Sequence, residues 1–339
     1  MPGRITALEV AAKAGVSRSA VSRVFTPGAS VSKSTADKVR KAADALGYRP
    51  NVIARSLITG RSRIIGLVVA YLENQFYPEA LERLSKSLQE QGYHLLVFMA
   101  SNDAEETEDV IQELLDYQVD GIIAASVGLS NDLTRRCAAA GIPVVLFNRS
   151  QPDMGLSSVT SANTAGGRKL AEFLVAAGHR RIGHIAGWEG ASTQIEREAG
   201  FVAGLQAAGM NLAARACGNF SLDGAKAAAR EMFETATPPD AVFVANDHMA
   251  FGVMDVLRFE LGLRIPEDVS VVGYDDVALA AWPSYDLTTV RQPANKMVAH
   301  TVQMLLDRIS DGGLPAQHLA LDGPLIIRGS ARLPEGHGT

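Results

Sequence analysis

Polar side chains follow three apolar segments that are typical of buried strands. Asn148–Arg149 follows "VVLF", Asn246–Asp247 follows "AVFVA", and Asp275–Asp276 follows "VVGY". Because ligands of parallel α/β sheets bind beyond the carboxyl ends of the strands, we expect these groups to face one ligand. Amide, carboxylate and guanidinium groups offer paired donors and acceptors, which suits a polyhydroxylated molecule. Three aromatic residues in or near loops after strands could cover the apolar face of a sugar: Phe76, Trp188 and Phe220.

Spacing alone leaves other interpretations of these residues open. Asn246 or Asp247 could cap a helix over residues 247–261, and Arg197, between two glutamates, could form an exposed ion pair of little energetic value. Asp275 and Asp276 could form a catalytic carboxylate pair, but adjacent residues of an extended segment point to opposite faces.

Motifs typical of enzymes are missing from the sequence. We find no Walker-type phosphate loop, no His-x-x-x-His metal pair and no Gly-x-Ser-x-Gly elbow. His179 and His184 show no ligand spacing and are expected to be structural. We therefore expect no catalytic residue, no metal site and no cofactor.

A second group of candidate residues lies near the N-terminus, in a predicted helix that Ser17 can cap. Val21 and Val24 would face a small core. The opposite side of the helix carries polar residues, namely Arg18, Ser19, Ser22 and Arg23. Arginine can bond guanine through two acceptors, and Ser17, Ser22 and the helix N-terminus suit phosphate. Each arginine could alternatively clamp a phosphate or remain solvated.

The charge distribution supports a polyanion-binding N-terminal segment. Residues 1–63 hold 12 Lys and Arg against 3 Asp and Glu, a net charge of +9. The rest of the chain holds 20 basic and 34 acidic residues, a net charge of −14. A basic end on an acidic body is expected of a nucleic-acid-binding module.

Three short helices are predicted to position the N-terminal residues. Residues 6–14 begin with a capping-box pattern, Thr6 and Glu9, and end at Gly15. The next helix runs from Ser17 to about Phe25, and a third fits residues 33–46 before Gly47. Helix, glycine turn and helix form the helix-turn-helix signature. Residues 51–58 form a further apolar stripe, too short for a stable isolated helix, which could pair with a second subunit, wedge into the minor groove or be a plain linker.

From Ile64 onward, short apolar runs alternate with helical segments. The predicted strands cover residues 64–70, 94–99, 121–126, 143–147, 181–186, 241–245 and 269–274. Such strands, buried on both faces with helices between them, indicate doubly wound parallel α/β sheets, and about 270 residues favour two lobes with a cleft. The sequence contains no membrane-length apolar run and no secretory signal, and its two cysteines suggest no disulfide framework, so we expect a cytoplasmic protein.

The segments "ITALEVAAKAGVSRSAVSRVF" and "VSKSTADKVRKAADALGYRPNVIARSL" resemble the headpiece and hinge of the LacI–GalR (lac repressor) family, and the resemblance continues to "LIIRGSA" at residues 325–331. It implies that Arg18 and Ser19 are the main specificity positions, that Arg23 contacts a further base, and that Leu57 enters the minor groove. Ile58 departs from the alanine or lysine of well-known members. The full set of expected DNA contacts is Thr6, Ser17, Arg18, Ser19, Ser22, Arg23, Asn51, Ala54, Arg55 and Leu57.

The core is similar to periplasmic sugar-binding proteins, and "QIEREAGF" at residues 194–201 resembles the segment whose arginine holds the effector. Arg197, Asn246 and Asp275 are the leading effector candidates. The others are Phe76, Asn148, Arg149, Thr193 and Phe220. Many relatives carry aspartate where Asn148 stands, and the loss of that charge, with two arginines nearby, suggests an acidic or less basic ligand.

The resemblance implies a division of the chain into a headpiece (1–49), a hinge helix and linker (50–61), a core (62–331) and a tail (332–339). Within the core, one lobe takes about 62–161 and 291–322, and the other takes about 162–290 and 323–331. We expect a homodimer on pseudo-palindromic operator DNA, because two identical headpieces impose twofold symmetry on the site. We expect a dimer rather than a tetramer because the last residues show no apolar heptads.

The predicted function is a sequence-specific transcriptional regulator, most simply a repressor, that responds to a sugar-like small molecule. The alternatives are a corepressor-dependent regulator that responds to purines or nucleosides, an enzyme with a DNA-binding headpiece, and a solute-binding protein. The sequence does not distinguish an inducer from a corepressor.

Overall fold

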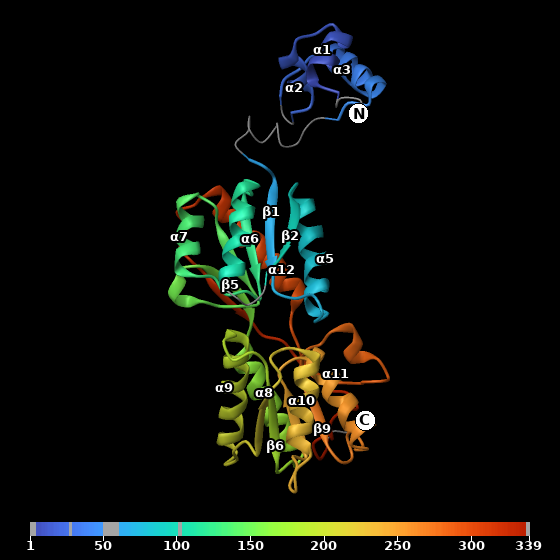
Figure 1. The fold of residues 1–339 in the computed structure, drawn as a ribbon, viewed down its shortest axis with the longest axis vertical. Helices are drawn as coiled ribbons and strands as arrows, with labels where there is room; N and C mark the ends of the chain where they lie inside the picture. The colour runs from blue at the N-terminus through green and yellow to red at the C-terminus, as the bar shows by residue number, and fades with distance from the viewer. Residues whose placement is uncertain (1–4, 27–28, 50–60, 101–103, 337–339) are drawn as a thin grey trace. The chain divides into compact units, whose positions relative to one another are not determined.

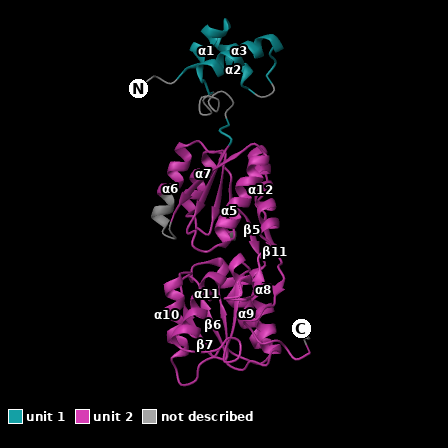
Figure 2. Ribbon diagram, turned by 90° about the vertical axis from the view of Figure 1, so that its right-hand side faces the viewer, with its two compact units in different colours: residues 1–63 teal, residues 64–339 magenta. Residues whose placement is uncertain are grey.

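The computed structural model describes residues 5–26, 29–49, 61–100 and 104–336. The chain divides into two compact units, residues 1–63 and residues 64–339, which Figure 2 colours separately. Each unit has its own hydrophobic core.

The first unit is a three-helix bundle built as its capping residues predict. Helix α1 (Ala7–Ala14) has Thr6 as its N-cap in a reciprocal capping box with Glu9, and it ends at Gly15 in the left-handed conformation. Helix α2 (Arg18–Val24) is capped by the Ser17 side chain, and α3 (Lys33–Leu46) ends at left-handed Gly47. The three helices bury one small core, whose fully buried members are Val10, Ala11, Val21, Val39, Ala42 and Ala43.

The second unit contains two six-stranded sheets, each covered by helices (Figure 1). The first sheet has the order β11-β5-β4-β3-β1-β2 and is parallel throughout. Its strands are β1 (Ile64–Val69), β2 (His94–Met99), β3 (Gly121–Ala125), β4 (Val144–Phe147), β5 (Ser157–Ser161) and β11 (His318–Leu321). Its helices are α5 (Phe76–Glu90), α6 (Ala104–Asp116), α7 (Asn131–Ala139) and α12 (Ala294–Ser310).

The second sheet has the order β12-β10-β9-β8-β6-β7, and only the β10–β12 pair is antiparallel. Its strands are β6 (Ile182–Ala186), β7 (Ala214–Cys217), β8 (Ala241–Val244), β9 (Ser270–Asp275), β10 (Thr288–Arg291) and β12 (Leu325–Ile326). Its helices are α8 (Asn163–Ala176), α9 (Ser192–Ala207), α10 (Leu222–Phe233) and α11 (Asp247–Asp255), which continues as a π-helix over Val256–Glu260. The chain passes between the two lobes after β5, β10 and β11.

All seven predicted strands are present, with small shifts at their ends. The expectation that each is buried on both faces was wrong for β2, because β2 lies at a sheet edge, where Met99 is 50% exposed. Sequence reasoning missed β5, whose five residues "SSVTS" are buried although mostly polar. Its hydroxyls have partners: Ser161 Oγ lies 2.9 Å from the Tyr274 hydroxyl, and Ser157 Oγ accepts the Gln317 amide. Buried hydroxyls with partners are tolerated, so polarity did not exclude a central strand.

Candidate functional site

The predicted DNA-reading residues lie on the exposed side of α2 and at the helix caps. Arg18, Ser19 and Arg23 are exposed, Ser22 is half-buried, and Val21 on the opposite side is buried. Positions three and four apart share one face of a helix, so these four polar residues form one surface. The surface carries two guanidinium groups and the N-terminus of α2, which suits a polyanion.

Thr6 and Ser17, which are predicted to contact DNA, also cap helices α1 and α2. The Thr6 hydroxyl donates to Glu9 Oε2 at 2.9 Å and accepts the Glu9 amide. The Thr6 backbone amide donates to the same Glu9 oxygen at 2.6 Å, and this bond, together with the one from the hydroxyl, lowers the pKa of Glu9. Ser17 Oγ accepts the Ala20 amide at 3.2 Å and lies 2.9 Å from Ser19 Oγ. The remaining predicted contacts, Asn51, Ala54, Arg55 and Leu57, fall outside the described residues.

Arg197, in the first two turns of α9, is buried and contacts four other residues. It is 2% exposed, its Nε donates to Asn163 Oδ1 at 3.0 Å, and its Nη1 donates to the Ala245 carbonyl at 2.7 Å. Its Nη2 lies 3.5 Å from Asp275 Oδ1, and its guanidinium stacks 3.7 Å from the Tyr274 ring centre. The alternative of an exposed surface ion pair is therefore wrong.

Asp275, the last residue of β9, joins the two lobes. Its Oδ2 accepts from Asn74 Nδ2 at 3.0 Å, and its Oδ1 accepts from Gln292 Nε2 at 2.7 Å. Burial raises the pKa of Asp275, whereas Arg197 and these two amides act in the opposite direction. The Asp276 carboxylate instead forms ion pairs with Arg291 and Arg328. Asp275 and Asp276 therefore have separate partners and do not form the catalytic carboxylate pair considered above.

Non-glycine residues with positive φ gather at the strand ends. Asn148 follows β4 with φ 55°, Ser126 follows β3 with φ 62°, and Asp275 has φ 130°. Such conformations cost about 1–3 kcal/mol each and are concentrated at functional sites. The strand ends therefore carry both the convergent polar groups and the strained backbone.

Asn148 and Arg149 are almost completely buried, each 3% exposed. Asn148 Nδ2 donates to the Tyr77 hydroxyl at 3.1 Å, and Arg149 Nη2 donates to the Ser126 carbonyl at 2.8 Å. The Arg149 guanidinium also lies 5.5 Å from the ring centre of Trp188, which belongs to the other lobe. Burial lowers the pKa of Arg149, and Arg197 acts in the same direction.

Asn246 has the helix-capping role that the sequence left open, whereas the Asp247 side chain bonds groups outside the helix. Asn246 Oδ1 accepts the Met249 amide at 2.9 Å and caps α11. Asp247 accepts the Val277 amide at 3.0 Å and the Thr289 hydroxyl at 2.6 Å, and its burial, with Asp275 nearby, raises its pKa to about 7. Thr193, 5% exposed, lies in the first turn of α9 near Arg197.

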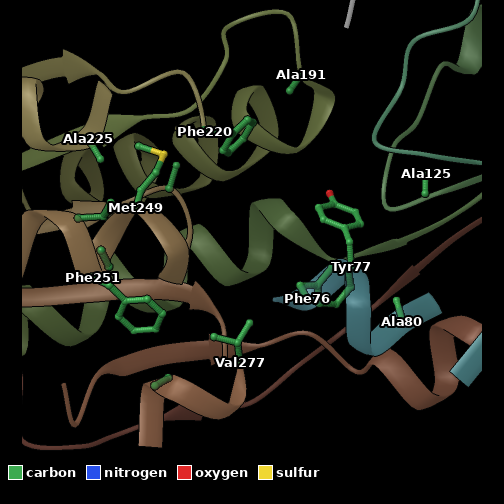
Figure 3. Packing of buried hydrophobic residues seen from close by; sticks show 14 of the residues in the cluster. Phe76, Tyr77, Ala80, Ala125, Ala191, Phe220, Ala225, Met249, Phe251 and Val277 are labelled. Carbon is green, nitrogen blue, oxygen red and sulfur yellow. The ribbon is translucent and has the colours of Figure 1, made fainter. Parts of the chain in front are cut away.

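Two of the three aromatic candidates, Phe76 and Phe220, lie in or near segments that follow strands, and both are buried in the core. Phe76 begins α5 and stacks on Phe147 at 6.1 Å, and Phe220 is 8% exposed after β7. Figure 3 shows Phe76 and Tyr77 from one lobe and Phe220 with Met249 from the other. A cavity of about 370 Å³ reaches Phe76, Asp275 and Gln292.

Several buried polar atoms between the two lobes lack a hydrogen-bond partner among the described residues. Native proteins satisfy most such atoms, so each unsatisfied one indicates a missing partner such as a ligand or water. The atoms of this group are Asn148 Oδ1, Arg149 Nε, Arg149 Nη1, His248 Nε2 and Gln292 Oε1.

Sequence reasoning missed four members of this cluster. Asn74 lies in the turn after β1, and its place beyond a strand end was a usable signal. Gln292 follows β10, a strand that was itself missed because "TTVR" is polar. Tyr77 and Ser126, which bond each other, carry no distinctive spacing.

Within the described residues, no three His, Cys, Asp or Glu side chains are grouped so as to hold a metal ion. No helix in that part of the chain combines the length and apolarity needed to cross a membrane.

Comparison with known proteins identifies two segments of the chain. Residues 6–51 match the family of bacterial regulatory proteins called the lacI family, and residues 171–331 match a periplasmic binding protein-like domain. The chain is 34% identical to the HTH-type transcriptional repressor PurR of Vibrio atlanticus over 309 residues, covering 90% of this chain and 92% of the relative. It is 36% identical to the HTH-type transcriptional regulator CelR of Thermobifida fusca over 330 residues, covering 95% and 96%.

Solved structures of transcriptional regulators also resemble nearly the whole chain. A complex of the regulator CelR with cellobiose has a TM-score of 0.73 and 34% identity, covering 96% of this chain and 100% of that one. A lac repressor dimer bound to operator and the anti-inducer ONPF has a TM-score of 0.87 and 28% identity, covering 97% and 99%.

The chain is thus a two-unit protein with a helix-turn-helix headpiece and a periplasmic-binding-protein-like core. It belongs to the LacI family of bacterial regulatory proteins. It is a DNA-binding transcriptional regulator of the repressor type that responds to a small-molecule effector.

Proposed function

We propose that the effector binds between the two lobes of the core, in contact with Arg197, Asp275, Arg149 and Asn148. The observation that carries this proposal is the set of buried polar atoms without partners, which a ligand rich in hydroxyl groups would satisfy. The CelR–cellobiose complex supports a sugar-like effector for a chain of this fold. The full set of proposed contacts is Phe76, Asn148, Arg149, Thr193, Arg197, Phe220, Asn246 and Asp275.

The proposed mechanism uses the contacts that already connect the lobes. Asn74 on one lobe bonds Asp275 on the other, and the Ser150 amide donates to Ser192 Oγ at 3.0 Å. A ligand between the lobes that prefers one arrangement shifts the equilibrium toward it by its differential affinity. A preference of 10⁴-fold corresponds to about 5.5 kcal/mol.

We propose that two copies of the chain read a pseudo-palindromic operator, as the lac repressor dimer on its operator suggests. The exposed face of α2 supplies base contacts from Arg18 and Arg23, with Ser19 and Ser22 beside them. In this proposal residues 1–49 read DNA, residues 50–61 connect, and residues 62–331 bind effector and dimerise. The protein acts in the cytoplasm and binds rather than transforms its small molecule.

The test uses the full chain, a symmetric operator selected from random duplexes, and a thermal-shift screen of sugars, sugar acids, nucleosides and purine bases. A ligand bound only by the folded protein raises its melting temperature. An inducer lowers operator affinity, and a corepressor raises it.

Arg197→Met should abolish the response to the ligand. Because it also removes the counterion of Asp275, operator binding without ligand is measured on the same preparation to show that the variant is folded. Arg264→Met is the matched control, because Arg264 is exposed and forms its ion pair with Asp268, four residues away. An Arg197 variant that still responds fully would contradict the proposed site.

A further inference from the structure

Arg149 is a buried cation without an anion. Its guanidinium lies 5.5 Å from the ring centre of Trp188, and Nη2 donates to the Ser126 carbonyl. Nε and Nη1 have no hydrogen-bond partner, and no carboxylate of the described residues forms an ion pair with this guanidinium. A buried charge without a partner is costly, so its retention needs a reason beyond packing.

The acidic groups nearby are already committed to other partners. Asp275 is paired with Arg197 and accepts two amide bonds. Burial keeps Asp247 largely protonated below about pH 7, and its oxygens accept from Thr289 and Val277. Glu196 accepts from Ser150 Oγ at 3.1 Å and Asn163 Nδ2 at 2.9 Å. None of these three carboxylates forms an ion pair with the Arg149 guanidinium.

Asn148 is the neighbouring residue that could have supplied the missing charge. Its amide is oriented by the Tyr77 hydroxyl, which leaves Oδ1 buried and without a donor. An aspartate at the same position would present a carboxylate next to Arg149, whereas the amide presents only a neutral acceptor. A ligand complementary to this site therefore carries an anionic acceptor next to Arg149 and a hydroxyl or N–H donor next to Asn148 Oδ1.

We propose that the effector is a polyhydroxylated carboxylic acid whose carboxylate binds the Arg149 guanidinium while a hydroxyl donates to Asn148 Oδ1. This inference rests on the proposed effector function and adds the class of ligand. Charge-assisted bonds from arginine to carboxylate are about twice as strong as neutral ones. A carboxylate supplies a charged acceptor for a guanidinium whose Nε and Nη1 have no partner among the described residues.

The experiment measures binding to the full chain by calorimetry, with ligands matched in carbon skeleton. The probes are D-glucose, D-gluconate, D-glucuronate, D-galactose, D-galacturonate, D-ribose, D-ribonate and D-glucose 6-phosphate. At least one acid is expected to bind about tenfold or more tightly than its neutral parent sugar. Tight binding of neutral sugars alone, or of the phosphate alone, overturns the inference but leaves the effector function intact. If none of these ligands binds, the inference fails, and the thermal-shift screen of nucleosides and purine bases decides the effector function separately.

Two variants test the charge directly. Asn148→Asp supplies an internal carboxylate to Arg149 and should weaken the acid about 10- to 100-fold while the neutral sugar is unaffected or strengthened. Arg149→Gln is the second test, and it also serves if Asn148→Asp does not fold. It should remove the preference for the acid over the neutral sugar. Arg135→Gln is the control, because Arg135 is an exposed arginine of α7 paired with Asp132. An acid preference that survives both cleft variants refutes the assignment.

Discussion

Replacing Asp275 with asparagine tests whether the centre between the lobes is held by charge. The variant keeps the shape of the side chain but leaves Arg197, which is 2% exposed, without its counterion. It also replaces one of the two oxygens that accept from Asn74 and Gln292 with a donor. Both changes destabilise the folded core.

Removing one partner of a buried ion pair costs about 3–5 kcal/mol. Burial already raises the pKa of Asp275, so part of that cost is offset by relief of a desolvated charge, and we expect a net loss of about 2–4 kcal/mol. For a domain of this size, the loss lowers the melting temperature by about 4–12 °C. Scanning calorimetry and urea unfolding of the full chain measure both quantities.

Asp268→Asn provides the matched control. Asp268 is an aspartate that pairs with Arg264 in an exposed loop, where such pairs contribute about 0–1 kcal/mol. If Asp275→Asn lowers stability no more than Asp268→Asn, the claim that charge holds the two lobes together is refuted.

Three further predictions concern other parts of the chain. Arg18→Ala should weaken operator binding by about 1–3 kcal/mol and relax preference at one base pair, and an unchanged footprint in a binding-site selection would contradict it. Gly167→Ala should displace α9 and weaken effector binding, because a Cβ there would lie 2.0 Å from the Arg197 carbonyl oxygen. Calorimetry measures the loss, with Gly312→Ala as the control, because a Cβ at Gly312 would contact no other atom within 4 Å. The folded pKa of Asp247, about 7, exceeds its unfolded value of 3.8, so the stability that this group contributes is present below pH 4 and is lost as pH rises through 7. Asp247→Asn should therefore flatten unfolding free energy between pH 4 and 8, and a curve parallel to that of the unsubstituted protein would show that another group is responsible.

The sequence predicted the elements where local chemistry decides them. Thr6, Ser17, Gly15 and Gly47 act as the caps that their types favour, because capping depends on a few adjacent residues. The central strands were found because they are continuous apolar runs. Strand β5 was missed because its burial depends on partners such as Tyr274, far away in the chain.

For the candidate effector site, the sequence likewise predicted the positions of residues but not their contacts. Residues directly after strands could be identified, since the carboxyl edge of a parallel sheet follows from the strand order. The roles of the individual atoms could not be, since they depend on contacts across more than a hundred positions, as between Asn74 and Asp275. The sequence showed Arg149 beside Asn148, whereas only the structure shows that the guanidinium lacks an anion.

The central claim is that a basic helical headpiece reads DNA and that its affinity is set by a ligand held between the lobes of the core. The most direct measurement is the anisotropy of a labelled, selected symmetric duplex titrated with the full chain at several salt concentrations, with and without the ligand found by thermal shift. The account predicts salt-sensitive binding that exceeds binding to random duplex by at least about 10³-fold and changes on adding the ligand. Equal affinity for both duplexes, unaffected by ligand, would contradict it.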